Sequence, residues 1–212
     1  SVPARGQRIV YVSAAAQGAD DGTSWTAAYT DLQDALDDVR DHDGCPCEIW
    51  IDQGIYKPDR GTGDRMLSYE LVGDVGLYGG FAGWEECRED RNPKLYQTIL
   101  NGDLNDDDDD ELPPHGDASC CQGNTPGCQD ATCTASVAAE FPHCTGYWDW
   151  RCADIALRLC CEVCRPTRCD NSNHVLRATG TVTTAILDGL TVTRGEAFDT
   201  FDILGGGLSG AD

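Results

Sequence analysis

Ten of the 13 cysteines in this chain of 212 residues lie between residues 120 and 169. Such a density leaves three explanations, namely a metal cluster, a redox device or a set of disulfides. A zinc site needs paired cysteine or histidine ligands at short spacing, and only Cys161 and Cys164 form a C-x-x-C pair. A redox dithiol is expected at the start of a helix after a strand, whereas this pair comes late in a helix-like run.

The size of this segment favours disulfides. A segment of about 50 residues buries too little apolar surface to fold alone, and cross-links substitute for the missing core. Each closed loop contributes on the order of 2–4 kcal/mol. Helical spacing predicts one buried face formed by Trp148, Cys152, Ile155 and Leu159. The sequence does not give the connectivity of the predicted disulfide cysteines, which are Cys120, Cys121, Cys128, Cys133, Cys144, Cys152, Cys160, Cys161, Cys164 and Cys169.

The other cysteines are Cys45, Cys47 and Cys87. We predict one further disulfide among them, joining Cys87 to Cys45 or to Cys47. Because 13 is odd, at least one thiol is expected to stay free or to bond to another molecule.

The charge balance is strongly acidic, with 37 Asp and Glu against 15 Lys and Arg and a formal net charge of −22. Such a surface repels phosphate backbones, so nucleic acid is not an expected partner. No apolar run approaches the roughly 18 residues of a membrane span, so no transmembrane segment is predicted. The cysteine content is typical of an oxidising compartment, which predicts a secreted or cell-surface protein. The opening SVPARG suggests a mature product whose signal peptide has been removed.

The run GDLNDDDDDE (102–111) is a candidate calcium site. It places oxygen-bearing side chains at alternate positions, as calcium loops of the D-x-N-x-D type do. Asp108 stands where such a loop has glycine, and Pro114 stands where it has a bidentate glutamate. A solvated acidic linker is the favoured interpretation, and Ca²⁺ is the alternative. The candidate ligands are Asp103, Asn105, Asp107 and Asp109.

Short strands and one clear helix set the expected fold class. Residues 30–41 predict an amphipathic helix with Leu32, Leu36 and Val39 on one face, and Thr30 and Gln33 have the spacing of a capping box. Segments rich in β-branched and aromatic residues predict strands within 8–13, 47–52, 69–81, 98–104, 173–179 and 184–195. Gly, Asn and Asp corners, without hairpin signals of the Asn-Gly type, favour a solenoid of parallel strands over a sandwich.

The strand pattern is interrupted between residues 105 and 172. We therefore predict four parts: 1–104 with the first strands, an acidic linker at 105–118, an inserted cysteine-rich module at 119–170, and strands again at 171–212. Loops tolerate such insertions well.

Several motifs together resemble a known family. YVSAAAQGADDGTSWTAAYTDLQDAL, EIWIDQGIYKP, LYGGFAGWEECREDRNP, TILNGDLN and AILDGLTVTRG resemble the amino-terminal part of large secreted bacterial proteins with right-handed parallel β-helix repeats, of pectin-lyase-like fold and related to polymorphic outer-membrane-type repeat proteins. The resemblance implies an all-β, right-handed parallel β-helix with an N-terminal capping helix and a disulfide-rich, partly helical insertion. It also implies that strands continue past residue 212 or stack on a neighbour, which would give head-to-tail association.

The function that this resemblance implies is a structural, adhesive or filament-forming role at the cell surface, with self-association or other surface proteins as partners. The alternative is a polysaccharide-active enzyme, for which Arg194 could supply the basic residue of a groove, although a surface arginine is the favoured interpretation. No catalytic residue is predicted. A further alternative is a glycan-binding module, because the aromatic residues of GYWDW could stack on sugar rings or form the core of the insertion. The possible glycan contacts are Tyr147, Trp148 and Trp150.

Overall fold

The structure of the protein is a computed structural model, and it describes residues 8–41, 47–108, 118–121, 123, 128–164, 168–178, 184–196 and 208–210. The chain divides into two compact units. Unit 1 comprises residues 1–104 and 172–212, and unit 2 is the intervening segment 105–171. Within the described ranges, no helix has the length and apolar character needed to cross a membrane.

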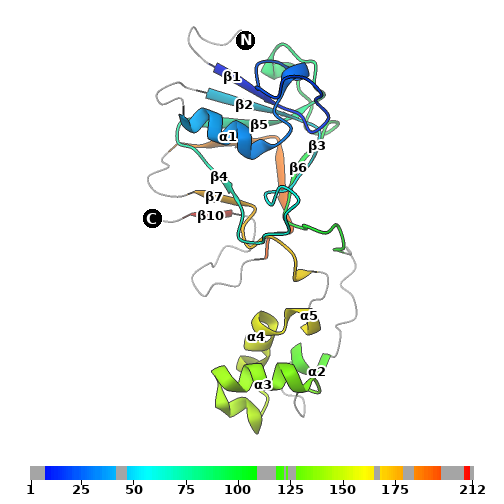
Figure 1. Cartoon of the computed structure of the whole chain (residues 1–212), viewed down its shortest axis with the longest axis vertical. Helices are drawn as coiled ribbons and strands as arrows, with labels where there is room; N and C mark the ends of the chain where they lie inside the picture. The colour runs from blue at the N-terminus through cyan, green and yellow to red at the C-terminus, as the bar shows by residue number, and fades with distance from the viewer. Residues whose placement is uncertain are drawn as a thin grey trace. The chain divides into compact units, whose positions relative to one another are not determined.

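Unit 1 is built from short strands that pair in parallel in three sheets (Figure 1). The four-stranded sheet has the order β1 (Arg8–Val12), β2 (Cys47–Asp52), β5 (Val75–Phe81) and β8 (Ile186–Asp188). The second sheet has the order β3 (Gly54–Tyr56), β6 (Thr98–Asn101) and β9 (Leu190–Thr193). The third has the order β10 (Leu208–Gly210), β7 (Leu176–Ala178) and β4 (Tyr69–Glu70).

The register of the four-stranded sheet places side chains of the same kind next to each other on neighbouring strands. Because side chains alternate along a strand, each face of the sheet receives its own column. One column is aliphatic and consists of Val10, Ile49, Leu77 and Leu187. The other is aromatic and consists of Tyr11, Trp50 and Tyr78. The aliphatic column lies in the main hydrophobic core, and the aromatic column packs with Phe81 and with Trp25 of the 3₁₀ helix η1 (Trp25–Ala27).

Helix α1 (Leu32–Asp41) covers the aliphatic side of this sheet (Figure 1). Leu32, Leu36 and Val39 are buried in the core, as the helical spacing predicts. The capping residue differs from the prediction, because the Gln33 backbone N–H donates to Asp31 Oδ1 at 2.7 Å. Thr30 instead donates its backbone N–H and its hydroxyl to Asp20 Oδ1.

Unit 2 is helical in its described residues. Its elements are α2 (Ala118–Cys121), α3 (Ala131–Glu140), the 3₁₀ helix η3 (Pro142–Thr145), α4 (Trp150–Leu159) and α5 (Cys161–Cys164). Asp130 caps α3 by accepting from the Cys133 N–H, and Asp149 caps α4 by accepting from the Arg151 and Cys152 N–H groups. Such caps satisfy donors that the first helical turn leaves unpaired.

Four disulfides hold these helices together. They join Cys120 to Cys128, Cys121 to Cys164, Cys133 to Cys160 and Cys144 to Cys152. The last three are nested, so each loop encloses the next. Cys169 is also disulfide-bonded. The described structure is therefore disulfide-rich, as would fit an oxidising environment.

The predicted fold class is wrong. The described residues are mixed α/β, with 29% helix and 24% strand, and they form short parallel sheets in place of an all-β solenoid. The physical reason lies mainly in unit 2, where the capped first turns of α3 and α4 favour helices. Even within unit 1, the described strands are only two to seven residues long.

Candidate functional site

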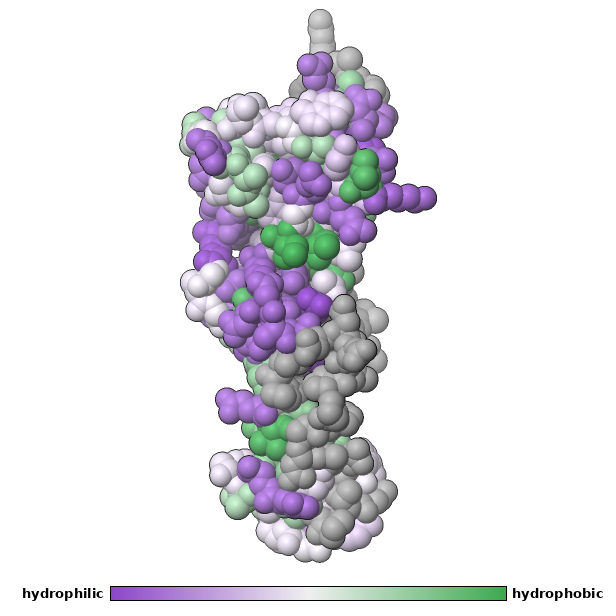
Figure 2. Space-filling model, turned by 90° about the vertical axis from the view of Figure 1, so that its right-hand side faces the viewer, coloured by the Kyte–Doolittle hydropathy of each residue, from purple (hydrophilic) through white to green (hydrophobic). Residues whose placement is uncertain are grey.

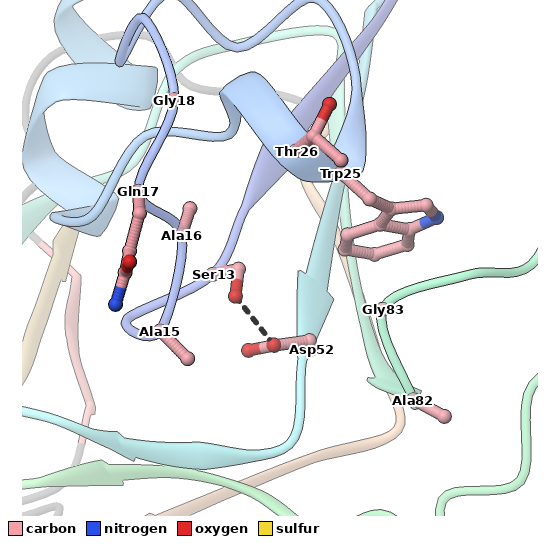
Figure 3. Close-up of a pocket in the computed structure, with 10 residues that line it drawn as sticks. All are labelled: Ser13, Ala15, Ala16, Gln17, Gly18, Trp25, Thr26, Asp52, Ala82 and Gly83. Carbon is pink, nitrogen blue, oxygen red and sulfur yellow. Dashed lines mark hydrogen bonds between the residues drawn. The ribbon is translucent and has the colours of Figure 1, made fainter.

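A pocket of about 530 Å³ opens in unit 1 at the carboxyl ends of three adjacent strands (Figure 3). Ser13 follows β1, Asp52 ends β2, and Ala82 and Gly83 follow β5. Carboxyl ends of parallel strands meet at one edge of a sheet, which is a frequent place for ligands to bind. The remaining lining residues are Ala15, Ala16, Gln17, Gly18, Trp25 and Thr26.

Asp52 lies at the floor of this pocket and is 8% exposed. Its Oδ2 accepts a hydrogen bond of 2.6 Å from the Ser13 hydroxyl, and its Oδ1 accepts one from the Tyr56 hydroxyl. Figure 3 shows the Ser13 and Asp52 side chains pointing toward each other, between the loop that carries Gln17 and the ring of Trp25. The Ser13 and Tyr56 hydroxyls are neutral. They orient the Asp52 carboxylate but do not neutralise its charge.

Burial raises the pKa of Asp52 above its ordinary value of 3.8. The Ser13 and Tyr56 hydrogen bonds oppose this rise, and the negative charge of Glu85 adds to it. Burial and the neighbouring Asp52 also raise the pKa of Tyr56, so its hydroxyl remains a donor at neutral pH.

The raised pKa of Asp52 predicts a pH effect on stability. Between the unfolded and the folded pKa, the folded protein binds more protons, so the free energy of unfolding falls as pH rises. Asp52→Asn removes this titration and nearly keeps the shape of the side chain. We therefore expect the stability of the variant, relative to the native protein, to increase from acidic to neutral pH. Urea unfolding at several pH values measures this difference, and a relative stability that decreases over that range would contradict the assignment.

Two glycines and one glutamate shape the walls of the pocket. Gly83 has a φ of +89°, in the region that favours glycine, so a larger residue there would strain the loop. A Cβ on Gly18 would lie 2.1 Å from the Thr26 carbonyl oxygen, which shows how closely these loops approach. Glu85 is 2% exposed, and its carboxylate accepts from the N–H groups of Ala82, Gly83 and Trp84. Its backbone oxygen accepts from Trp25 Nε1 at 2.9 Å, so Glu85 links both walls.

The three aromatic residues predicted as glycan contacts in unit 2 differ in their exposure. Trp148 is 2% exposed and donates from Nε1 to the Cys120 carbonyl oxygen at 3.1 Å, so it belongs to the core of the unit. Tyr147 and Trp150 are 58% and 67% exposed. The glycan contact predicted for Trp148 is therefore wrong, because its ring is enclosed among cysteines.

Polar groups surround the exposed pair. The Arg151 guanidinium lies 5.2 Å from the centre of the Trp150 ring, a distance that permits a cation–π contact. His143 packs edge-on against Tyr147, and its Nε2 lies 3.5 Å from Asp149 Oδ2. The loop thus combines flat apolar faces with hydrogen-bonding groups.

The candidate calcium ligands are divided between the two units. Asp103 is buried in unit 1, where its Oδ2 lies 3.3 Å from Arg194 Nη1. Asn105 and Asp107 are exposed and belong to unit 2, where the Asn105 N–H donates to Asp170 Oδ2 at 2.9 Å. Asp109 lies outside the described residues. Calcium binding by this run stays a prediction.

Cys87, one of the three cysteines outside residues 120–169, does not form its predicted bridge. Cys87 has a free thiol, and Cys47 is buried in β2. The predicted disulfide between Cys87 and Cys47 is therefore wrong, since strand pairing places the Cys47 side chain in the main core. Cys45 and the side chain of Cys161 lie outside the described structure.

The Asp52 pocket was missed by reasoning from the sequence. A usable signal existed, since Ser13 and Asp52 both stand where a predicted strand ends. Arg194, the candidate basic residue of an enzyme groove, is an ion-pair partner of the buried Asp103.

Comparisons of the chain with protein families, with curated proteins and with solved structures found no match. The site geometry therefore carries the functional argument.

Proposed function

We propose that this chain belongs to an extracellular, non-catalytic adhesive protein and that unit 2 binds polysaccharide through Tyr147 and Trp150. The observation that carries the proposal is the exposure of these two large rings beside a buried Trp148. Two large rings exposed on one loop form a candidate contact surface.

The loop that presents the rings is held in place at several points. The Cys144–Cys152 disulfide closes it, and Trp148 anchors its centre in the core. Asp149 caps α4 directly before Trp150. Rings held in this way lose little conformational entropy on binding, which favours affinity.

Saccharide is a better occupant of this surface than a protein partner. Sugar rings have apolar faces that stack on aromatic side chains and hydroxyls that pair with neighbours such as His143, Asp149 and Arg151. A stable protein interface needs roughly 800 Å² from each partner, and Leu159 is the other large apolar residue exposed in the described part of unit 2. The net charge of −22 favours a neutral or basic polysaccharide over an acidic one.

The proposed extracellular location rests on the disulfides. Four disulfides cross-link unit 2, and most of the buried core residues of this unit are cysteines. Disulfides persist in oxidising compartments. On the face drawn in Figure 2, apolar residues form small separate patches among hydrophilic ones, as suits a solvated exterior.

Binding of the whole chain to immobilised neutral and basic polysaccharides tests the proposal. We expect Tyr147→Ala and Trp150→Ala each to weaken binding by roughly tenfold, because each removes a stacking contact of about 1 kcal/mol or more. Affinity electrophoresis or pull-down with insoluble polysaccharide measures the effect.

Trp84→Ala is the matched control, since Trp84 is also 67% exposed but lies in unit 1. It should leave binding unchanged. Absence of binding to every polysaccharide, or equal loss in the Trp84 variant, would rule out unit 2 as the glycan surface.

A further inference from the structure

We propose that the Asp52 pocket of unit 1 binds a small organic cation with an ammonium group, of about the size of one amino sugar. This site is separate from the surface proposed above, and the two proposals stand or fall independently.

Uncompensated negative charge is the first reason. Two buried carboxylates lie here: Asp52 lines the pocket, and Glu85 binds the N–H groups of the lining residues Ala82 and Gly83. Asp52 accepts from two hydroxyls, and Glu85 accepts from backbone N–H groups, and all of these donors are neutral. A buried charge costs free energy unless an opposite charge or strong hydrogen bonds accompany it.

The lining selects against anions. None of the ten residues described as lining the pocket is lysine, arginine or histidine. A carboxylate has about four acceptor positions, and the two hydroxyls leave the others available to a ligand. A primary ammonium supplies three donors and the missing positive charge.

The other walls suit the rest of such a ligand. Trp25 presents an aromatic ring whose π-system attracts cations. It is fixed by its bond to the Glu85 carbonyl oxygen and by an edge contact with Tyr11. Gln17 and Thr26 add an amide and a hydroxyl at the rim, and Figure 3 shows Gln17 across the pocket from Trp25. The volume of about 530 Å³ accommodates a single sugar ring with water.

Glucosamine and glucose form a matched pair of probes, because they have nearly the same shape and differ in the ammonium group. Calorimetry or ligand-detected nuclear magnetic resonance on the whole chain, slightly below neutral pH, measures both affinities. We expect glucosamine to bind at least about tenfold more tightly than glucose, as charge-assisted hydrogen bonds predict.

Three variants locate the binding. Asp52→Asn should reduce glucosamine affinity to the level of glucose, and Gln17→Lys should do the same by placing an ammonium of its own at the rim. Gln17 is exposed, so its replacement tests the site even if Asp52→Asn fails to fold. Asp90→Asn is the control, because it removes one charge from an exposed position outside the pocket.

Equal binding of glucosamine and glucose, or glucosamine binding that survives Gln17→Lys, would overturn the proposal. A loss of the same size in Asp90→Asn would overturn it as well, because the attraction would then come from net charge and not from the pocket.

Discussion

Reduction of the disulfides is expected to unfold unit 2 while unit 1 keeps its sheets. Six of the nine buried residues in the core of unit 2 are cysteines, and the others are Val137, Trp148 and Ala156. Reduction therefore removes the cross-links and leaves too few apolar side chains to hold the helices. The four described disulfides all join cysteines of unit 2, so the hydrophobic core of unit 1 does not depend on them.

Hydrogen exchange with mass spectrometry, with and without reductant, measures this effect segment by segment. Amides of α3 and α4 should lose protection on reduction, whereas those of β2 and β5 should retain it. Equal loss in both units would show that unit 1 depends on the disulfides, and full protection of α3 after reduction would show that unit 2 does not.

Single disulfides should differ in the stability they contribute. Cys133 and Cys160 are 27 residues apart, whereas Cys144 and Cys152 are 8 apart. In the chain-entropy account, the longer loop contributes about 3.5 kcal/mol and the shorter about 2.5 kcal/mol. Replacing each pair by serine and comparing urea unfolding of unit 2 should give this order.

Leu77→Ala is expected to destabilise unit 1 by about 2–5 kcal/mol. Leu77 has no exposed surface and lies in the aliphatic column, where β5 aligns it with Ile49 and Leu187 on the neighbouring strands. Truncation removes its buried contacts and leaves a cavity that close packing on both sides keeps from collapsing.

Urea unfolding followed by exchange of the β2 and β5 amides, with disulfides intact, measures the loss in unit 1 alone. Leu95→Ala is the matched control, because Leu95 is 64% exposed and its truncation should change stability by less than about 0.5 kcal/mol. A cost for Leu77→Ala no larger than that of the control would contradict the assigned core.

Local patterns predicted the elements of unit 1 well. The β-branched and aromatic residues of 8–13 and 47–52 correspond to β1 and β2, and the helical spacing of Leu32, Leu36 and Val39 corresponds to the buried face of α1. These predictions succeed because residue type and spacing are expressed within a few consecutive residues.

Patterns failed where distant residues decide the outcome. Leu159 is 42% exposed, although helical spacing placed it on the same face as the buried Cys152, because α4 ends at Leu159 and the helix buries Cys152, Ala153 and Ala156. The Asp52 pocket depends on Ser13, which is 39 positions away and becomes a neighbour only when β1 and β2 pair. The all-β prediction failed because helices, expected for only part of the insertion, make up most of the described residues of unit 2.

Within each unit, hydrogen bonds join the two chain segments that lead to the other unit. In unit 2, the Asn105 N–H donates to Asp170 at 2.9 Å, and Asn171 Nδ2 donates to Asp108 at 2.8 Å. In unit 1, the Ser172 N–H donates to the Gly102 carbonyl oxygen at 2.7 Å. An inserted domain whose two ends lie close together can be accommodated in a loop without distorting the surrounding fold. Such a domain can be moved to another protein as one piece. Evolution could therefore have exchanged or acquired it as one piece, and protein engineers could transplant it into a surface turn of an unrelated scaffold.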